Sequence, residues 1–175
     1  MALGTALSDA VTVSTTAGVH AISFNSDGIA VVNNVLDTVP NILYICLMSY
    51  HIDYLNNAPV QDGDYTQISV SYMEEFAGSL RPDLTIALGG VAISVDAENS
   101  GNGDDAYNNK FDLTGSVAWD DIRGDSTTAA NFRRADSSSY FLGVASRIYT
   151  GRGSAIKQNV RSVFAFDLSG SSGTV

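Results

Sequence analysis

The strongest constraint in this sequence is an alternation of apolar and polar residues with a period of two. In residues 111–120, the apolar residues Phe111, Leu113, Val117 and Trp119 all fall on one side of the alternation. Residues 66–72 alternate in the same way. Because successive side chains of a β-strand point to opposite faces, this pattern predicts half-buried strands of an antiparallel sheet with one solvated face.

Similar patterns recur along the rest of the chain. Residues 41–55 predict one long strand that is covered on both faces at its start and on one face at its end. The pair Gly89-Gly90 lies between the alternating residues 84–88 and 91–95, and predicts a bulge or a sharp bend. Further strands are predicted at residues 11–14, 19–24, 28–32, 140–150 and 160–168, and a hairpin turn at residues 151–154.

Helix signals are few by comparison. Residues 73–80 predict a short helix, and residues 127–135 predict another behind a cap at Asp125 and Ser126. Residues 99–105 and 124–139 have the composition of long loops. The sequence therefore predicts an all-β fold, an antiparallel β-sandwich in the form of a single jelly roll of about eight to nine strands with one or two short helices.

The chain shows no internal repeat and no linker that would divide it. We therefore expect a single domain over residues 1–175. Residues 1–17 are expected to form an extended N-terminal arm, in which the β-prone residues 6–17 could add a strand to a neighbouring chain. Residues 169–175 form a Ser/Gly-rich C-terminal tail.

The charge of the chain is sparse and lopsided. Its 19 acidic residues outnumber 9 basic ones, which gives a net charge of −10, and Asp dominates over Glu and Arg over Lys. Without a basic stripe to hold phosphates, direct contact with nucleic acid is not expected. The N-terminus lacks the pattern of a signal peptide, and the longest apolar stretch, residues 42–50, is about half the length of a membrane span.

Residues capable of catalysis are scarce. The lone cysteine, Cys46, lies in an apolar run and is expected to be buried and inert. His51 and Asp53 are one strand period apart, which predicts a polar pair on a solvated face. A His–Asp pair that orients a catalytic base is the alternative, but no Gly-x-Ser-x-Gly turn accompanies it. No catalytic residue and no organic cofactor is predicted, so the chain is expected not to be an enzyme.

One loop carries the chemistry of a cation site. Oxygen donors recur at alternate positions, as in a calcium loop, although Tyr107 occupies the twelfth position in place of the usual bidentate glutamate. An acidic surface turn is the simpler interpretation. The candidate ligands of a structural Ca²⁺ ion are Asp96, Glu98, Asn102, Asp104 and Asp105.

The chain as a whole resembles a class of proteins. Its length, its short strands, its many Asn/Ser/Thr/Gly/Asp turns and its lack of a catalytic constellation resemble those of a virion structural protein. The preference for Asp over Glu and for Arg over Lys resembles proteins of halophilic archaea and their viruses. The chain is thus similar to the small single jelly-roll capsid proteins of membrane-containing icosahedral haloarchaeal viruses.

This resemblance implies a homo-oligomeric subunit that self-assembles into a capsid shell, is located in the virion after assembly in the host cytoplasm, and contacts other virion proteins and an underlying viral membrane. One alternative is a tail-tube or capsid-decoration protein of a tailed virus. A second is a calcium-dependent carbohydrate- or surface-binding module with Trp119 in an aromatic platform, although the apolar alternation places Trp119 in the core. The least favoured is a hydrolase that uses His51 and Asp53.

Overall fold

The chain is built mostly of strands with a few short helices. The computed structural model describes residues 5–12, 20–63, 66–70, 83–88, 91–96, 106–125, 132–134, 142–151, 153–173 and 175. The strand pairings it describes are antiparallel, which confirms the predicted all-β antiparallel class. The elements in chain order are α1 (Ser26–Leu36), β1 (Ile42–Leu47), the π-helix η1 (Tyr50–Tyr54), β2 (Thr66–Val70), β3 (Asp83–Leu88), β4 (Val91–Asp96), β5 (Ala106–Asp112), α2 (Trp119–Asp125), β6 (Phe132–Arg134), β7 (Leu142–Gly151) and β8 (Ser154–Asp167).

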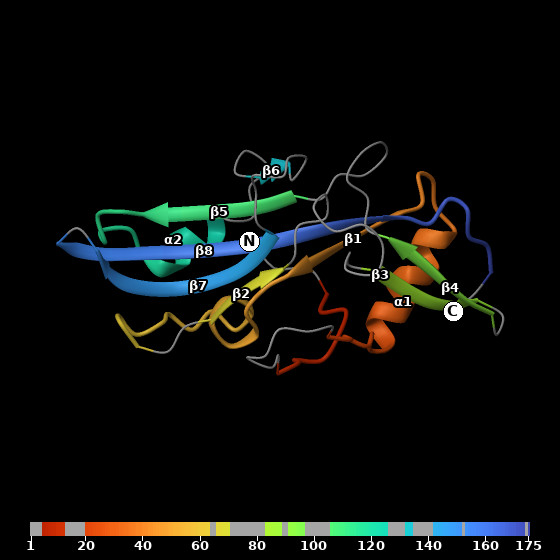
Figure 1. Cartoon of the computed structure of the whole chain (residues 1–175), viewed down its shortest axis with the longest axis horizontal. Coiled ribbons are helices and arrows are strands. Elements are labelled where there is room, and N and C mark those ends of the chain that lie inside the picture. The colour runs from red at the N-terminus through yellow and green to blue at the C-terminus, as the bar shows by residue number, and fades with distance from the viewer. Residues whose placement is uncertain are drawn as a thin grey trace.

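The 14-residue strand β8 organises the main sheet (Figure 1). The sheet has the order β2-β7-β8-β5-β6, and β1 also pairs with β8. Along β8, residues 154–160 pair with β7, residues 162–167 pair with β1, and residues 157–163 pair with β5. A strand has two edges. The residues of β8 that pair with β5 overlap both those that pair with β7 and those that pair with β1. It follows that β7 and β1 share the opposite edge of β8, one after the other, and that the change of partner falls at Arg161.

The apolar core lies on one face of the second half of β8. Phe164, Phe166 and Leu168 share this face and pack with residues from α1, from β1 and from the separate β3–β4 hairpin. The buried members of the cluster are Val32, Leu43, Leu84, Ile86, Leu88, Phe164, Phe166 and Leu168. In Figure 1, α1 and the β3–β4 hairpin lie toward one end of the long axis, and the β7–β8 hairpin reaches the other. The core therefore occupies one end of an elongated molecule.

Helix α1 replaces the strand predicted at residues 28–32. Its N-cap, Asn25, accepts a hydrogen bond from the backbone amide of Gly28 at 2.9 Å, which fixes the first turn. Val32 is fully buried, and Val35 and Leu36, three and four residues later, pack against the same core. Burial at this helical spacing outweighs the strand preference of the β-branched residues, so the prediction of a strand was wrong.

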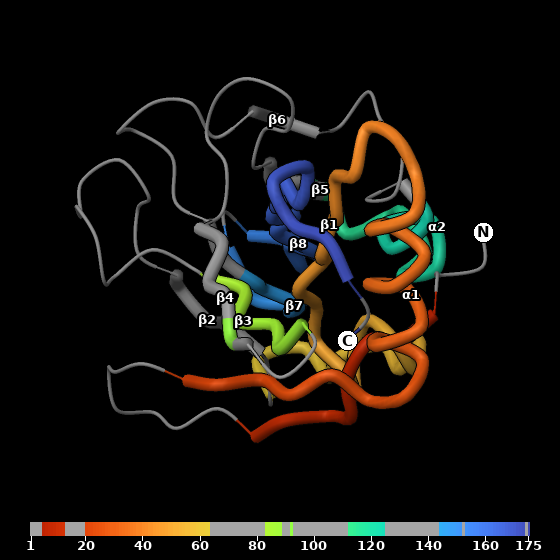
Figure 2. The backbone as a smooth tube through the Cα atoms, turned by 90° about the vertical axis from the view of Figure 1, so that its right-hand side faces the viewer, coloured from red at the N-terminus to blue at the C-terminus, as the bar shows by residue number. Residues whose placement is uncertain are grey.

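Both ends of the chain are tied to α1. Near the N-terminus, an isolated bridge pairs Ser8 with Phe24, and Asn25 donates from its backbone amide to the carbonyl of Leu7 at 3.0 Å. At the C-terminus, the amide of Val175 donates to the side chain of Asn33 at 2.9 Å. Figure 2 shows this end of the chain beside α1. The described part of the predicted arm, residues 5–12, therefore contacts its own chain, and the Ser/Gly tail is held by the helix beside it.

The remaining strand predictions divide between confirmed and wrong ones. Strands β2, β3, β4 and β7 confirm the predictions, as does the turn between Gly151 and Ser154, while β8 confirms the strand predicted at residues 160–168 but already begins at Ser154. The strand predicted at residues 19–24 was wrong over residues 20–23, which belong to no strand. The strand predicted over residues 41–55 was wrong beyond Leu47, where η1 follows, and the strand predicted over residues 111–120 ends at Asp112, before α2. Residues 132–134 form β6 instead of helix, whereas the helix predicted at residues 73–80 lies outside the described residues.

The contact between α1 and the N-terminal segment makes a prediction about Gly28. A Cβ atom at this position would lie 2.2 Å from the carbonyl oxygen of Leu7. We expect Gly28→Ala to lower the free energy of unfolding and to speed proteolysis near residues 5–12, although alanine alone favours a helix by about 1 kcal/mol. Urea unfolding and timed proteolysis followed by mass spectrometry measure both effects.

Gly124 in α2 provides the matched control for this prediction. A Cβ atom there would meet no atom within 4 Å, so Gly124→Ala should leave stability unchanged or raise it by up to about 1 kcal/mol. Equal responses of the two variants would contradict the packing described for the N-terminal segment.

Candidate functional site

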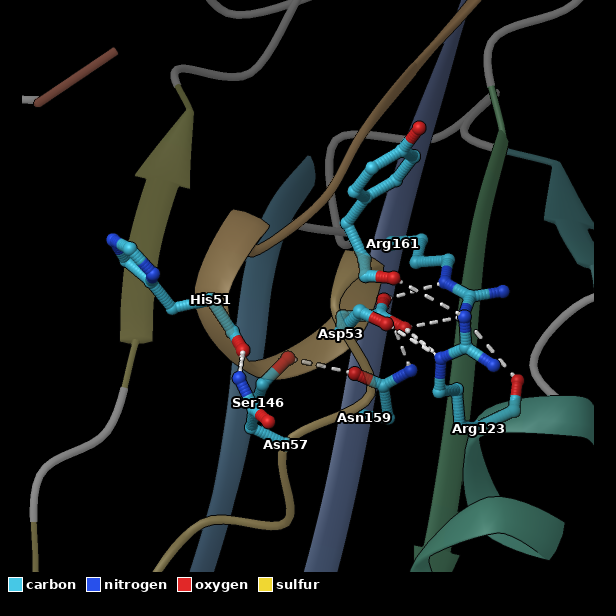
Figure 3. Close-up of polar contacts among 8 residues, drawn as sticks. His51, Asp53, Asn57, Arg123, Ser146, Asn159 and Arg161 are labelled. Carbon is cyan, nitrogen blue, oxygen red and sulfur yellow. Dashed lines mark hydrogen bonds and ion pairs between the residues drawn. The ribbon is translucent and has the colours of Figure 1, made fainter. Parts of the chain in front are cut away.

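The most concentrated polar chemistry in the described structure is a buried cluster centred on Asp53 (Figure 3). The carboxylate of Asp53 accepts two hydrogen bonds from Arg161, from Nε at 2.6 Å and from Nη2 at 2.5 Å. The exposed fractions are 0% for Asp53 and 2% for Arg161. The two side chains form a bidentate ion pair between residues 108 positions apart in the sequence.

The π-helix η1 turns Asp53 toward the sheet. The amide of Tyr54 donates to the carbonyl of Ser49 at 2.9 Å, and that of Leu55 donates to the carbonyl of Tyr50 at 3.0 Å. These bonds span five residues, so the chain coils here instead of continuing β1. His51 is exposed and points away from Asp53 in Figure 3. The prediction of a His51–Asp53 pair on a solvated face was therefore wrong.

Two further side chains connect Asp53 to the centre of the sheet. Asn159, two residues before Arg161 on the same face of β8, donates to Oδ2 of Asp53 at 3.2 Å. Its own side-chain oxygen accepts from the hydroxyl of Ser146 at 2.7 Å, and Ser146 is the cross-strand partner of Asn159 on β7. The cluster thus ties η1 to both strands of the β7–β8 hairpin.

A second arginine attaches α2 to the same cluster. Nε of Arg123 donates to the backbone carbonyl of Asp53 at 2.5 Å and lies 3.5 Å from the Asp53 carboxylate. Its Nη2 atom reaches the carbonyl of Tyr54, while Arg161 donates to the carbonyl of Arg123 at 3.3 Å. Asp53 therefore joins α2, β8 and η1, which approach it from three parts of the sequence.

This geometry suits a structural role for Asp53. Both carboxylate oxygens already accept hydrogen bonds from side chains on β8, and the charge is matched by a buried guanidinium. A catalytic acid or base must exchange a proton with a substrate, which requires access that a fully buried carboxylate lacks. What the arrangement can do is fix η1 in one orientation on the sheet.

Lys157, two residues before Asn159 on β8, forms a second polar site. Its Nζ donates to the carbonyl of Gly115 at 3.0 Å and to that of Val117, in the loop that leads into α2. Asp112 orders the same loop by accepting from the hydroxyl of Thr114 at 2.7 Å and from the amide of Val117 at 2.9 Å. These hydrogen bonds, with that of the Thr114 side chain foremost, lower the pKa of Asp112 from 3.8 to about 2.

A hollow lies along the C-terminal half of β7. It is lined by Asp62, Gly63, Arg147, Ile148 and Tyr149. The Arg147 guanidinium sits 4.6 Å from the centre of the Tyr149 ring, and its Nε donates to Gln158 at 2.7 Å. Hydrogen bonds from Thr150 lower the pKa of Asp62. Both charged groups are thus engaged with neighbouring side chains of their own chain.

The candidate calcium ligands fall mainly outside the described residues. Asp96 ends β4, opposite Asp83 on β3, while Glu98, Asn102, Asp104 and Asp105 lie outside the described ranges. Within those ranges, no three His, Cys, Asp or Glu residues are grouped to hold a metal ion. The calcium site therefore remains a prediction. None of the helices among the described residues is both long and apolar enough to cross a membrane.

The burial predictions for Trp119 and Cys46 have different outcomes, and one surface feature had no sequence signal. Trp119 is 7% exposed, which confirms its predicted burial, although it lies in α2 and not in a strand. Cys46 is exposed, so its predicted burial was wrong. The rings of Tyr50 and Tyr54 stack with centroids 5.6 Å apart, an arrangement that strand periodicity could not have indicated.

Comparisons with protein-family models, curated proteins and solved structures found no match to this chain.

The buried ion pair makes a direct prediction about stability. Asp53→Asn leaves the Arg161 guanidinium buried without its counter-charge, so we expect the free energy of unfolding to fall by about 3–5 kcal/mol. Urea unfolding followed by circular dichroism measures this loss. The control is Asp62→Asn, which removes an exposed carboxylate that also accepts two hydrogen bonds and should have a much smaller effect. Similar losses in the two variants would contradict the structural role of Asp53.

The lowered pKa of Asp112 predicts a pH dependence of stability. Because the pKa is lower in the folded state, the carboxylate stabilises the fold above about pH 4, and this contribution disappears as the pH falls toward about 2. Asp112→Asn should remove the contribution of this carboxylate to the pH dependence of stability. Melting temperatures of both proteins, measured in steps from about pH 5 to about pH 2, should therefore converge at the acidic end. A difference that stays constant over the whole range would contradict this account.

Proposed function

We propose that this chain is a non-enzymatic structural subunit that self-assembles into the shell of a virus. The observation that carries the proposal is that a charged pair is buried inside the fold while large apolar side chains are exposed on its surface. Asp53 and Arg161 neutralise each other inside the fold. Large apolar side chains stay exposed, Val39 by 93% and Val60 by 74% among them. Such a surface suits contact with other protein chains.

We propose further that the subunit folds as a jelly-roll sandwich. Its support is the antiparallel pairing of the described strands and the position of the β3–β4 hairpin. Leu84, Ile86 and Leu88 of this hairpin pack against Phe164 and Phe166 of the main sheet, as the second layer of a sandwich would. A shell subunit needs such a rigid body to hold its contacts at fixed angles.

The proposed setting is a virion in a medium of high salt. Salt screens the repulsion among subunits that each carry a net charge of −10. Burial of apolar surface is not weakened by screening, so apolar contacts can hold the shell together in that medium. The proposed partners are copies of the chain, other virion proteins and an underlying viral membrane.

Two other functions have a specific observation in their favour. A tail-tube or decoration protein would also use an acidic surface, which repels DNA, and a short helix such as α1. A carbohydrate- or surface-binding module would use the stacked rings of Tyr50 and Tyr54, since Trp119 is buried. Both rank behind the shell subunit because an acidic surface, a short helix and one pair of stacked rings are features that many proteins share.

Electron microscopy of the purified chain tests the proposal. We expect closed shells or curved lattices on raising the salt concentration from about 0.1 M to about 1 M, because screening removes the repulsion between subunits. Rings or stacked tubes would select the tail protein instead. A chain that stays monomeric at every salt and protein concentration would overturn self-assembly altogether.

A further inference from the structure

The segment between Asp37 and Asp62 differs in charge from the rest of the chain. Asp53 is its one charged residue when His51 is neutral, in a protein with a net charge of −10. The Asp53 side chain is fully buried and paired with Arg161. The surface that this segment contributes therefore carries no formal charge.

Several side chains of this segment are exposed along β1 and η1. Tyr44 is 56% exposed, Tyr50 is 41% exposed, Leu55 is 45% exposed, and Cys46 is also exposed. Tyr44 and Cys46 pair in register with Ala165 and Val163. Their side chains thus lie on the face of the sheet that carries Arg161, which η1 also covers. We call Tyr44, Cys46, Tyr50 and Leu55 the uncharged strip.

The strip is held in a fixed arrangement. The Tyr50 ring stacks on Tyr54 at an interplanar angle of 15°, and the Asp53–Arg161 pair anchors the turn that carries both rings. Among the described residues, the charged Asp167 and Arg123 lie beside the strip, and each is engaged within the chain. Asp167, opposite Ile42, accepts a hydrogen bond from the amide of Ser169, and Arg123 binds backbone carbonyls of η1. A preorganised surface loses little conformational entropy on binding.

The strand beneath the strip, β1, has one edge that none of the described strands covers. Among the described strands, β8 is the one that pairs with β1, so the second edge of β1 pairs with none of them. Proteins usually guard such edges with charged residues or proline. The sequence of β1, Ile-Leu-Tyr-Ile-Cys-Leu, contains neither. An edge of this composition is suited to pairing with another strand.

We propose that the uncharged strip and the second edge of β1 form the contact between two copies of this chain, with β1 of each copy paired antiparallel across a two-fold axis. The charge of the chain explains why a second copy would bind at this surface. Two copies of net charge −10 repel each other, and an uncharged surface lets them meet without bringing carboxylates together. A two-fold axis places the same surface on both sides, which an uncharged strip tolerates and an acidic one does not.

This inference rests on the proposed self-assembly and locates one of its interfaces. Tyrosine is enriched in the buried centres of protein interfaces, so Tyr44 and Tyr50 are suited to anchor the contact. Because apolar burial and backbone pairing hold it, association should strengthen as salt rises. An interface made of ion pairs would weaken instead.

Sedimentation velocity of the full chain tests the inference at about 0.1 M and about 1 M NaCl. We expect the dissociation constant of the wild-type dimer to fall with salt, and Tyr44→Asp to raise it about tenfold or more. The matched control is Leu113→Asp, which adds the same charge at a side chain that is 57% exposed and outside the strip. This control should leave the dissociation constant within about twofold of wild type. Thermal melts verify that both variants remain folded.

The outcomes separate the interface from the proposed function. If wild type associates and Tyr44→Asp associates equally well, or if Leu113→Asp weakens association as much, the strip is not the interface, although self-assembly stands. Association that weakens with rising salt also overturns the inference. If wild type does not associate at either salt concentration, the inference and the proposed self-assembly both fail.

Discussion

The ion pair between Asp53 and Arg161 is the constraint on which the rest of the structure depends. Arg161 lies where β8 changes its partner from β7 to β1, and Asp53 lies in the turn that follows β1. Removing two charges from water is expensive, so the pair is stable only with good geometry and further hydrogen bonds. Asn159 and Arg123 supply those bonds from β8 and α2. One buried carboxylate thereby fixes how three elements meet.

Much of the sheet could be predicted from the sequence, because strand alternation is a local signal. β7, β8 and the β3–β4 hairpin follow directly from it. The predictions failed at η1 and α1, where contacts between distant residues decide the conformation. The alternation through Tyr54 continues the pattern of β1, but the partner of Asp53 lies 108 residues away. No local pattern could identify Asp53 as a buried structural residue, so the candidate site was missed.

The same pair also links the interior to the surface. Because the one charge between Asp37 and Asp62 is turned inward, the side chains facing outward there are neutral and largely apolar. The acidity of the chain thus lies elsewhere on its surface, so that the proposed contact through the neutral surface brings no carboxylates together. A single interior contact in this way supports both the stability of the subunit and the selectivity of its proposed assembly.

Native-state hydrogen exchange tests the central role of the Asp53–Arg161 pair most directly. If the pair fixes η1 on the sheet, the amides of Tyr54 and Leu55 should exchange only through global unfolding, with the same opening free energy as the amide of Phe164 in β8. Their exchange should also accelerate with denaturant in the same proportion. The account would be contradicted if the η1 amides exchanged through a local opening. Such an opening would have a much smaller free energy than that of the Phe164 amide, and its rate of exchange would not depend on denaturant.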